Sequence, residues 1–171
     1  MGRTGKSSEI RRFLIASASL TTRSLASQAA IQFGITRQAA HRHLKDLVDE
    51  GVLLPSGQTR GREYHLATID RLNFKLEINK KLEEHRVWEQ YIRPRLDEVP
   101  ANVVALCNYG FTEILNNVID HSGGDQAHIR FSRTAASIEM RVTDNGIGIF
   151  RKIQLALNLA DPRLSILELA K

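Results

Sequence analysis

The chain has 171 residues, of which 42% are hydrophobic and 25% are charged, as in a soluble globular protein of one large or two small domains. It contains no apolar run near the roughly 20 residues of a membrane span, and its first residues lack the apolar segment of a secretory signal, so we expect no membrane partner. The single cysteine, Cys107, cannot form an internal disulfide, which favours a reducing cytoplasm and a packing role for this thiol.

The net charge of +5 is unevenly distributed along the chain. Residues 1–70 contain ten Lys/Arg and six Asp/Glu, a balance of +4, whereas residues 71–171 contain fourteen and thirteen, a balance of +1. A basic excess confined to one part predicts that this part has a nucleic-acid partner.

Two helices are predicted at the start of the chain. Ser7 can cap the first, which runs to about Ala18 and turns apolar side chains inward every three or four residues. Thr21 or Thr22 opens the second, which is rich in small residues and covers 23–31.

A third helix follows a tight turn at Phe33-Gly34-Ile35. Thr36 can cap this helix and Gly51 ends it, which gives the helix-turn-helix arrangement. Its buried arc comprises Ala40, Leu44, Leu47 and Val48. Its opposite arc and flank carry Arg37, Gln38, His41, Arg42 and Lys45.

Two short strands, at residues 52–54 and 64–66, are predicted around a basic, Gly-containing loop. The whole resembles a winged helix over residues 7–67, which gives an N-terminal domain of residues 1–67. Arg and Gln side chains on its third helix can reach guanine and adenine edges in a major groove. We therefore expect binding of double-stranded DNA by Arg37, Gln38, His41, Arg42, Lys45, Arg60 and Arg62. A winged helix used for protein contact is the alternative; RNA is disfavoured because no exposed aromatic platform is predicted.

Residues 68–99 are predicted to link this domain to a second one. Phe74, Leu76 and Ile78 alternate as in a strand, and residues 79–92 show a charged helical pattern in which Trp88 and Ile92 pack against a neighbour. No heptads indicate a coiled coil; a homodimer formed through this linker is a hypothesis.

A polar stripe is predicted on a helix that includes residues 113–121. The apolar arc of this segment comprises Ile114, Leu115, Val118 and Ile119. The opposite arc comprises Glu113, Asn116, Asn117, Asp120 and His121. A carboxylate, a carboxamide and an imidazole therefore follow one another at intervals of four residues. A solvated face of an ordinary amphipathic helix is the alternative interpretation.

A β-hairpin and a glycine-containing turn follow. Apolar alternation at Ile129/Phe131 and at Ile138/Met140/Val142 predicts two strands, and the second runs into Asp144-Asn-Gly146-Ile-Gly148. An acid at a strand end, followed by Gly-x-Gly, lets the backbone approach a ligand closely while the carboxylate accepts a hydrogen bond. A plain turn is the alternative.

Together these two segments resemble the nucleotide-binding half of the GHKL ATPases, named for gyrase, heat-shock chaperone, histidine kinase and mismatch-repair ATPases, over residues 100 to about 150. The resemblance implies a GHKL-like domain at residues 100–171 that binds ATP and Mg²⁺. It implies that Asn117 coordinates Mg²⁺, that Glu113 is the general base in hydrolysing members, and that His121 assists with phosphate. Oxygen ligands suit Mg²⁺, and a carboxylate can take a proton from water.

The same resemblance implies that Asp144 hydrogen-bonds the adenine amino group and that Gly146 and Gly148 shape the first glycine box. The family completes its site with a second glycine-rich box and a lid, whereas this chain has no glycine after Gly148. Residues 164–171 show a helical pattern without a stop signal. We expect a chain cut inside its last domain, in which ATP binding is weak or absent.

These features predict an α+β protein in which an N-terminal winged helix precedes a partial GHKL-type α/β sandwich. The expected function is a cytoplasmic, ATP-binding transcriptional regulator whose nucleotide occupancy biases DNA binding. One alternative is a protein kinase of the anti-sigma or histidine-kinase type, with His85 as the candidate phosphate acceptor. Another is a DNA-binding protein with a degenerate ATPase fold. Whether the intact protein hydrolyses ATP stays open.

Overall fold

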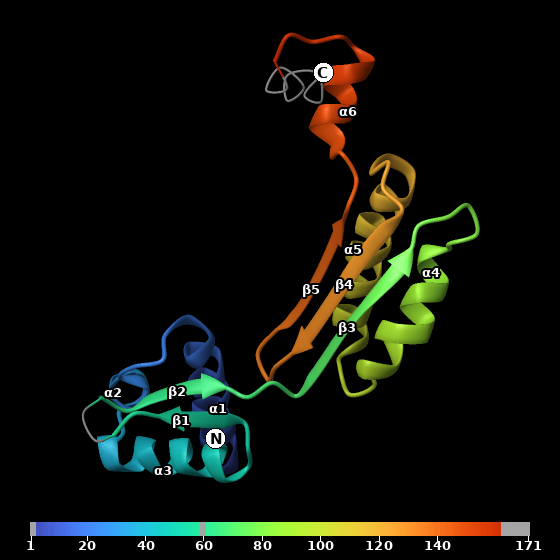
Figure 1. The fold of residues 1–171 in the computed structure, drawn as a ribbon. Helices are drawn as coiled ribbons and strands as arrows, with labels where there is room; N and C mark the ends of the chain where they lie inside the picture. Colours follow the sequence, from blue (N-terminus) through green and yellow to red (C-terminus); the bar gives the residue numbers. More distant parts are fainter. Residues whose placement is uncertain (1–2, 59–60, 162–171) are drawn as a thin grey trace. The chain divides into compact units, whose positions relative to one another are not determined.

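The computed structural model describes residues 3–58 and 61–161 of the chain (Figure 1). It contains helices and two small sheets, which confirms the expected α+β class. The chain divides into two compact units, one formed by residues 1–71 with 132–139 and the other by residues 72–131 with 140–171. The helical pattern at residues 164–171 and the predicted contact residue Arg60 lie outside the described residues. No described helix is long and apolar enough to cross a membrane.

The first unit contains the predicted order of three helices followed by two strands. These are α1 (Arg3–Leu20), α2 (Leu25–Phe33), α3 (Arg37–Asp49), β1 (Leu53–Ser56) and β2 (Glu63–Leu66). The two strands are antiparallel, with Leu53 opposite Leu66 and Ser56 opposite Glu63. One hydrophobic core holds them together, and Leu14, Leu44 and Leu53 from three of these elements are fully buried in it.

Both ends of α3 lie where the sequence predicts them. The Thr36 side chain accepts a hydrogen bond from the Ala39 N–H at 3.1 Å, as expected for an N-cap. At the other end Gly51 has a φ of 72°, and the N–H groups of Gly51 and Val52 donate to Val48 and Leu47 carbonyls at 2.9 Å. These bonds satisfy the last carbonyls of the helix in a Schellman motif.

The predicted starts of the first two helices were wrong. Helix α1 begins at Arg3, so Ser7 lies inside it and does not cap it. Helix α2 begins at Leu25 rather than after Thr21 or Thr22, because Thr22 is engaged elsewhere: its carbonyl accepts the Tyr64 N–H at 2.9 Å. This contact with β2 joins residues far apart in the sequence, so the sequence around Thr22 does not predict it.

The second unit is built on a sheet in the order β3-β4-β5, with helices on one side (Figure 1). Its elements are β3 (Asp70–Glu77), α4 (Glu84–Val87), the π-helix η2 (Trp88–Ile92), the 3-10 helix η3 (Arg93–Arg95), α5 (Ala101–His121), β4 (Gln126–Arg133), β5 (Ile138–Asp144) and α6 (Ile149–Ala156). The predicted hairpin is confirmed by β4 and β5, and the predicted strand around Phe74 is confirmed by β3.

The helix predicted at residues 79–92 forms only in its second half. The Asn79 side chain accepts the Lys81 N–H at 2.9 Å and its carbonyl accepts the Leu82 N–H at 3.0 Å, so a turn replaces the first helical residues. The predicted packing of Trp88 and Ile92 is confirmed because both are buried.

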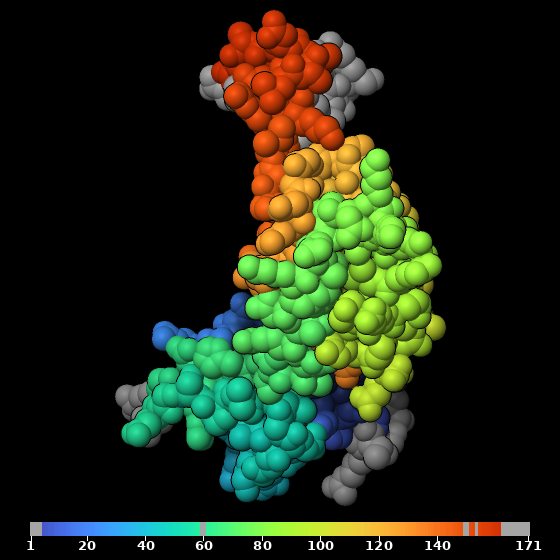
Figure 2. Space-filling model, turned by 45° about the vertical axis from the view of Figure 1, so that its right-hand side comes forward, coloured from blue at the N-terminus to red at the C-terminus, as the bar shows by residue number. Residues whose placement is uncertain are grey.

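Aromatic contacts join this segment to its neighbours. Phe74 of β3 stacks on Tyr91 of η2 with ring centroids 4.4 Å apart, and Trp88 packs on Phe111 of α5 at 5.9 Å. In the space-filling view of Figure 2, β3 and the helices that follow it lie side by side. The segment expected as a linker therefore contributes a strand and core side chains to the second unit.

Helix α5 buries a narrower face than the sequence predicts. Phe111, Leu115 and Val118 are buried with the spacing of one helical stripe. Ile114, assigned to the same arc, is 47% exposed, so that assignment was wrong. It lies about 60° from Phe111 around the helix, at the edge of the stripe. Beneath the helices, Ala127, Ile129 and Phe131 of β4 complete the core.

Candidate functional site

Helix α3 presents all of its predicted DNA-contacting side chains to solvent. Its buried face is fixed by Ala40, Leu44 and Leu47, each fully buried. The exposed residues on its outer face are Arg37, Gln38, His41, Arg42 and Lys45. The acidic residues of this helix, Asp46 and Asp49, lie in its last turns. The first turns therefore form a surface of hydrogen-bond donors and positive charge, as the sequence predicts.

The loop between β1 and β2 places Arg62 directly before β2, with its side chain exposed. Gly57 begins the turn with a φ of 71°, and a Cβ at this position would lie 2.5 Å from the Gly61 carbonyl oxygen. The loop thus depends on a residue without a side chain at Gly57. Arg60 belongs to the part of this loop that the structure does not describe.

Some arginines of the first unit form ion pairs with carboxylates of the same unit, and others do not. The Arg23 guanidinium contacts the Glu63 carboxylate at 2.6 Å, and its hydrogen bond lowers the pKa of Glu63 below the ordinary value. Arg11 pairs in the same way with Glu50. By contrast, Arg37, Arg42 and Arg62 have no ion-pair partner within the described part of the chain. Lys45 is intermediate, since Asp49 lies 3.9 Å away.

The predicted polar stripe is present on α5. Glu113, Asn117 and His121 are all exposed on this helix, and their side chains form no hydrogen bond or ion pair with a described residue. Mg²⁺ bound with a nucleotide needs only one or two protein oxygen ligands beside the phosphates and water. Asn117, the predicted ligand, matches that requirement in type, and both it and Glu113, the predicted general base, have no partner among the described residues.

The turn that follows β5 is fixed against the end of α5. The Asp144 carboxylate accepts the Gly146 N–H at 2.9 Å, and the Asn145 side-chain oxygen accepts the N–H groups of Asp125 and Gln126 at 3.0 Å. A Cβ on Gly146 would overlap the backbone of Ser122, whose carbonyl carbon would be 2.6 Å away. Gly146 is therefore required for close backbone packing.

Gly148 has a φ of 78°, which lets the chain turn into α6. Unlike at Gly146, no neighbouring atom would contact a Cβ at this position. On α6, the Lys152 ammonium donates to the carbonyls of Asp120 and His121 at 3.3 and 3.4 Å. A cation there is favoured by the negative end of the α5 dipole. Sequence reasoning missed Asn145 and Lys152, although the pair Gly123-Gly124 after the helix was a signal that another segment packs there.

Asp144 borders a pocket of about 240 Å³ together with Lys75, His128 and Thr143. The stripe residues Glu113, Asn117 and His121 are not among its lining residues. The structure thus brings the turn to the end of α5 without gathering Asp144 and the α5 stripe around this pocket. Within the described residues, no group of three His, Cys, Asp or Glu side chains could hold a metal ion.

The predicted roles of these residues therefore stay predictions, and relatives supply no further information. No family model matches the chain, and no curated protein or solved structure is significantly similar to it.

Proposed function

We propose that this chain is a transcriptional regulator that binds double-stranded DNA through the outer face of α3. One observation carries the proposal: the outer face of the first turns of α3 presents Arg37, Gln38, His41 and Arg42, all exposed, with no acidic residue in these turns and no ion-pair partner for either arginine within the described residues. Cations without local partners are those that can neutralise phosphates and release counterions.

The geometry of α3 suits entry into a major groove. Its exposed residues occupy about two and a half turns, and an α-helix fits the width of that groove. Arg42 can donate two hydrogen bonds to guanine, and Gln38 can pair with adenine. We expect Arg37, at the start of the helix, and Arg62, in the loop between β1 and β2, to contact the phosphate backbone.

Matched arginine substitutions test this proposal. Arg42→Ala removes an exposed cation from α3, and Arg12→Ala removes an exposed cation from α1, so both lower the net charge equally. We expect Arg42→Ala to weaken binding to a selected duplex by about 1–3 kcal/mol and to change the preferred sequence. Arg12→Ala should leave the preference unchanged. If the two substitutions had equal effects on affinity and on sequence preference, DNA binding would be non-specific electrostatic attraction, and α3 would not be the helix that recognises the sequence.

A second function, Mg·ATP binding by the other unit, is proposed on a separate observation. The Asp144–Gly148 turn packs against the end of the helix that carries Asn117 and His121, through a contact that only glycine permits at position 146. If nucleotide binds two arrangements of this unit with different affinity, occupancy can bias DNA binding. Coupling of this kind would make the chain a nucleotide-responsive regulator.

Calorimetry with Mg·ATP tests this second function. Any Mg·ATP binding by this chain, which is expected to be weak, should be lost in Asp144→Asn while the amide oxygen keeps the bond to Gly146, and should persist in Asp97→Asn, at another exposed carboxylate of the same unit. Glu113→Gln should stop hydrolysis and spare binding if Glu113 is the general base. Transfer of a labelled γ-phosphate from ATP to protein would favour a kinase. Absence of Mg·ATP binding together with normal DNA affinity would favour a degenerate ATPase fold.

A further inference from the structure

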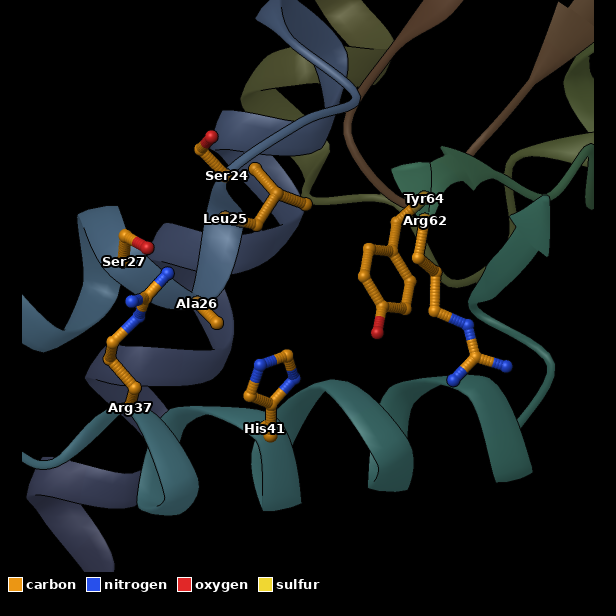
Figure 3. Close-up of a pocket in the computed structure, with 8 residues that line it drawn as sticks. All are labelled: Ser24, Leu25, Ala26, Ser27, Arg37, His41, Arg62 and Tyr64. Atoms are coloured by element: carbon orange, nitrogen blue, oxygen red, sulfur yellow. The ribbon is translucent and has the colours of Figure 1, made fainter. Parts of the chain in front are cut away.

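A pocket of about 330 Å³ lies in the first unit between the start of α2, helix α3 and the first residues of β2. Figure 3 shows Arg37 and His41 projecting from α3 toward α2, while Arg62 and Tyr64 project toward α3 from the opposite side. Ser24 and Ser27 mark the α2 wall of the pocket. Its volume is near the lower end of the range for small-molecule sites.

Tyr64 provides an unusual feature of this pocket. The residue is only 8% exposed, and its hydroxyl points into the pocket toward α3 (Figure 3). Its backbone N–H donates to the Thr22 carbonyl at 2.9 Å, but its hydroxyl has no hydrogen-bond partner within the described residues. The hydroxyl faces the pocket without a partner among the described residues, so it is free to donate a hydrogen bond to a group bound there.

The start of α2 supplies further donors. Ser24, the N-cap residue, has a φ of 61°, and its side chain makes no capping hydrogen bond. The N–H groups of Leu25 and Ala26 consequently have no acceptor in the described part of the chain, and the first turn carries no acidic residue. Free N–H groups and the positive end of the helix dipole both favour an anion.

The charged side chains around the pocket complete a set of donors. Arg37, His41 and Arg62 are exposed and form no ion pair with a described residue. Glu63, the nearest acid in sequence, is engaged by Arg23 and by the Thr22 hydroxyl and does not line the pocket. The lining therefore lacks a carboxylate and presents donors from three elements, with the guanidinium groups of Arg37 and Arg62 at opposite ends of the pocket (Figure 3).

We propose that this pocket binds one phosphate ester group, which accepts hydrogen bonds from the Tyr64 hydroxyl and the α2 N–H groups and is attracted by the positive charges of Arg37 and Arg62 on either side. A phosphodiester of the DNA backbone and the phosphate of a small free ester share this chemistry. In its DNA form the inference rests on the proposed function, because the same surface would then fix the register of α3 on the duplex. In its free-ester form it does not.

The variant that tests the site is Tyr64→Phe, with Tyr109→Phe, an exposed tyrosine of α5, as its control. Because the Tyr64 hydroxyl has no partner, its removal should not lower the urea midpoint of unfolding. A clear fall in that midpoint would show that the hydroxyl has a hydrogen-bond partner in the folded protein. Arg62→Gln, at an exposed position, gives a second variant that does not touch the core.

The first arm of the experiment needs no DNA. Inorganic phosphate and glycerol 3-phosphate are titrated into the full chain at constant ionic strength, with the amide signals of Leu25 and Ala26 as the readout. If the site takes a free ester, these signals saturate, and both Tyr64→Phe and Arg62→Gln weaken binding about tenfold, as for loss of a hydrogen bond to a charged group. Saturation that neither variant changes would overturn the site.

The second arm uses duplexes in which one phosphate at a time is replaced by an uncharged methylphosphonate. If the site takes a backbone phosphate, Tyr64→Phe weakens unmodified duplexes of unrelated sequence by about the same factor, up to tenfold. That effect disappears on the duplex that lacks the contacted phosphate.

The two arms of the experiment distinguish a failure of the proposed DNA binding from a failure of the proposed phosphate site. Absence of any DNA binding would reject the proposed function, and the phosphate titration would still decide the pocket. If phosphate does not saturate and Tyr64→Phe leaves DNA affinity unchanged, the pocket is not a phosphate site.

Discussion

The salt dependence of DNA binding is the prediction that follows most directly from the charges on the first unit. Three exposed cations of the described DNA-facing surface are expected at phosphates, namely Arg37, Lys45 and Arg62, because Arg42 is expected at a base. Each neutralised phosphate contributes about −0.9 to the slope of log affinity against log salt, so these three contribute about −2.7. Between 50 and 200 mM salt this contribution lowers the affinity about 40-fold. The ion pair of Lys45 with Asp49 reduces the share of that cation.

Two substitutions are compared by fluorescence anisotropy of a labelled duplex over a salt series. Arg37→Ala, at an expected phosphate contact, should reduce the magnitude of the slope by about 1, whereas Arg42→Ala, at an expected base contact, should lower affinity without changing the slope. Arg12→Ala on α1 is the control and should keep the full slope. A slope near zero for the unaltered chain, or the same reduction by Arg12→Ala, would refute the surface inferred from α3.

Further predictions concern stability and pH. Gly146→Ala should destabilise the chain by about 1–3 kcal/mol in urea unfolding, because the new Cβ overlaps the Ser122 backbone. Gly110→Ala, in open space within α5, should instead stabilise it by up to about 1 kcal/mol, and the reverse order would contradict the packing of the turn. The Arg23 hydrogen bond lowers the pKa of Glu63, so the stability of this pair is present above the ordinary glutamate pKa of about 4.3 and is lost as pH falls through the lowered value. NMR titration should show the Glu63 pKa rising in Arg23→Ala, and an unchanged value would mean that the pair does not form in solution.

The sequence predicted element boundaries in the first unit correctly where the hydrogen bonds that fix them are formed between residues close in sequence. Thr36 caps α3 and Gly51 ends it through hydrogen bonds within a few residues, so the sequence contains everything that fixes these boundaries. The start of α2 could not be predicted in this way. Thr22 has the chemistry of a cap, but its hydroxyl and carbonyl are used by Glu63 and Tyr64, about forty residues away.

The candidate sites show the same division between local and tertiary determinants. Periodicity placed Glu113, Asn117 and His121 on the exposed side of α5, since a helix separates its faces by spacing alone. The anchoring of the turn by Asn145 and the exposure of Ile114 depend on what packs against α5, which spacing does not reveal. The Tyr64 pocket was likewise not predicted, because it exists only where three elements meet.

The most direct test of DNA binding by α3 is to map, by NMR, which backbone and arginine side-chain signals of the full chain change when a duplex is added. We predict changes at residues 37–45 and at Arg62, with the Arg12 and Arg86 signals unchanged at moderate salt. Changes centred on the exposed side of the β3-β4-β5 sheet, or no changes at saturating duplex, would contradict DNA recognition by α3.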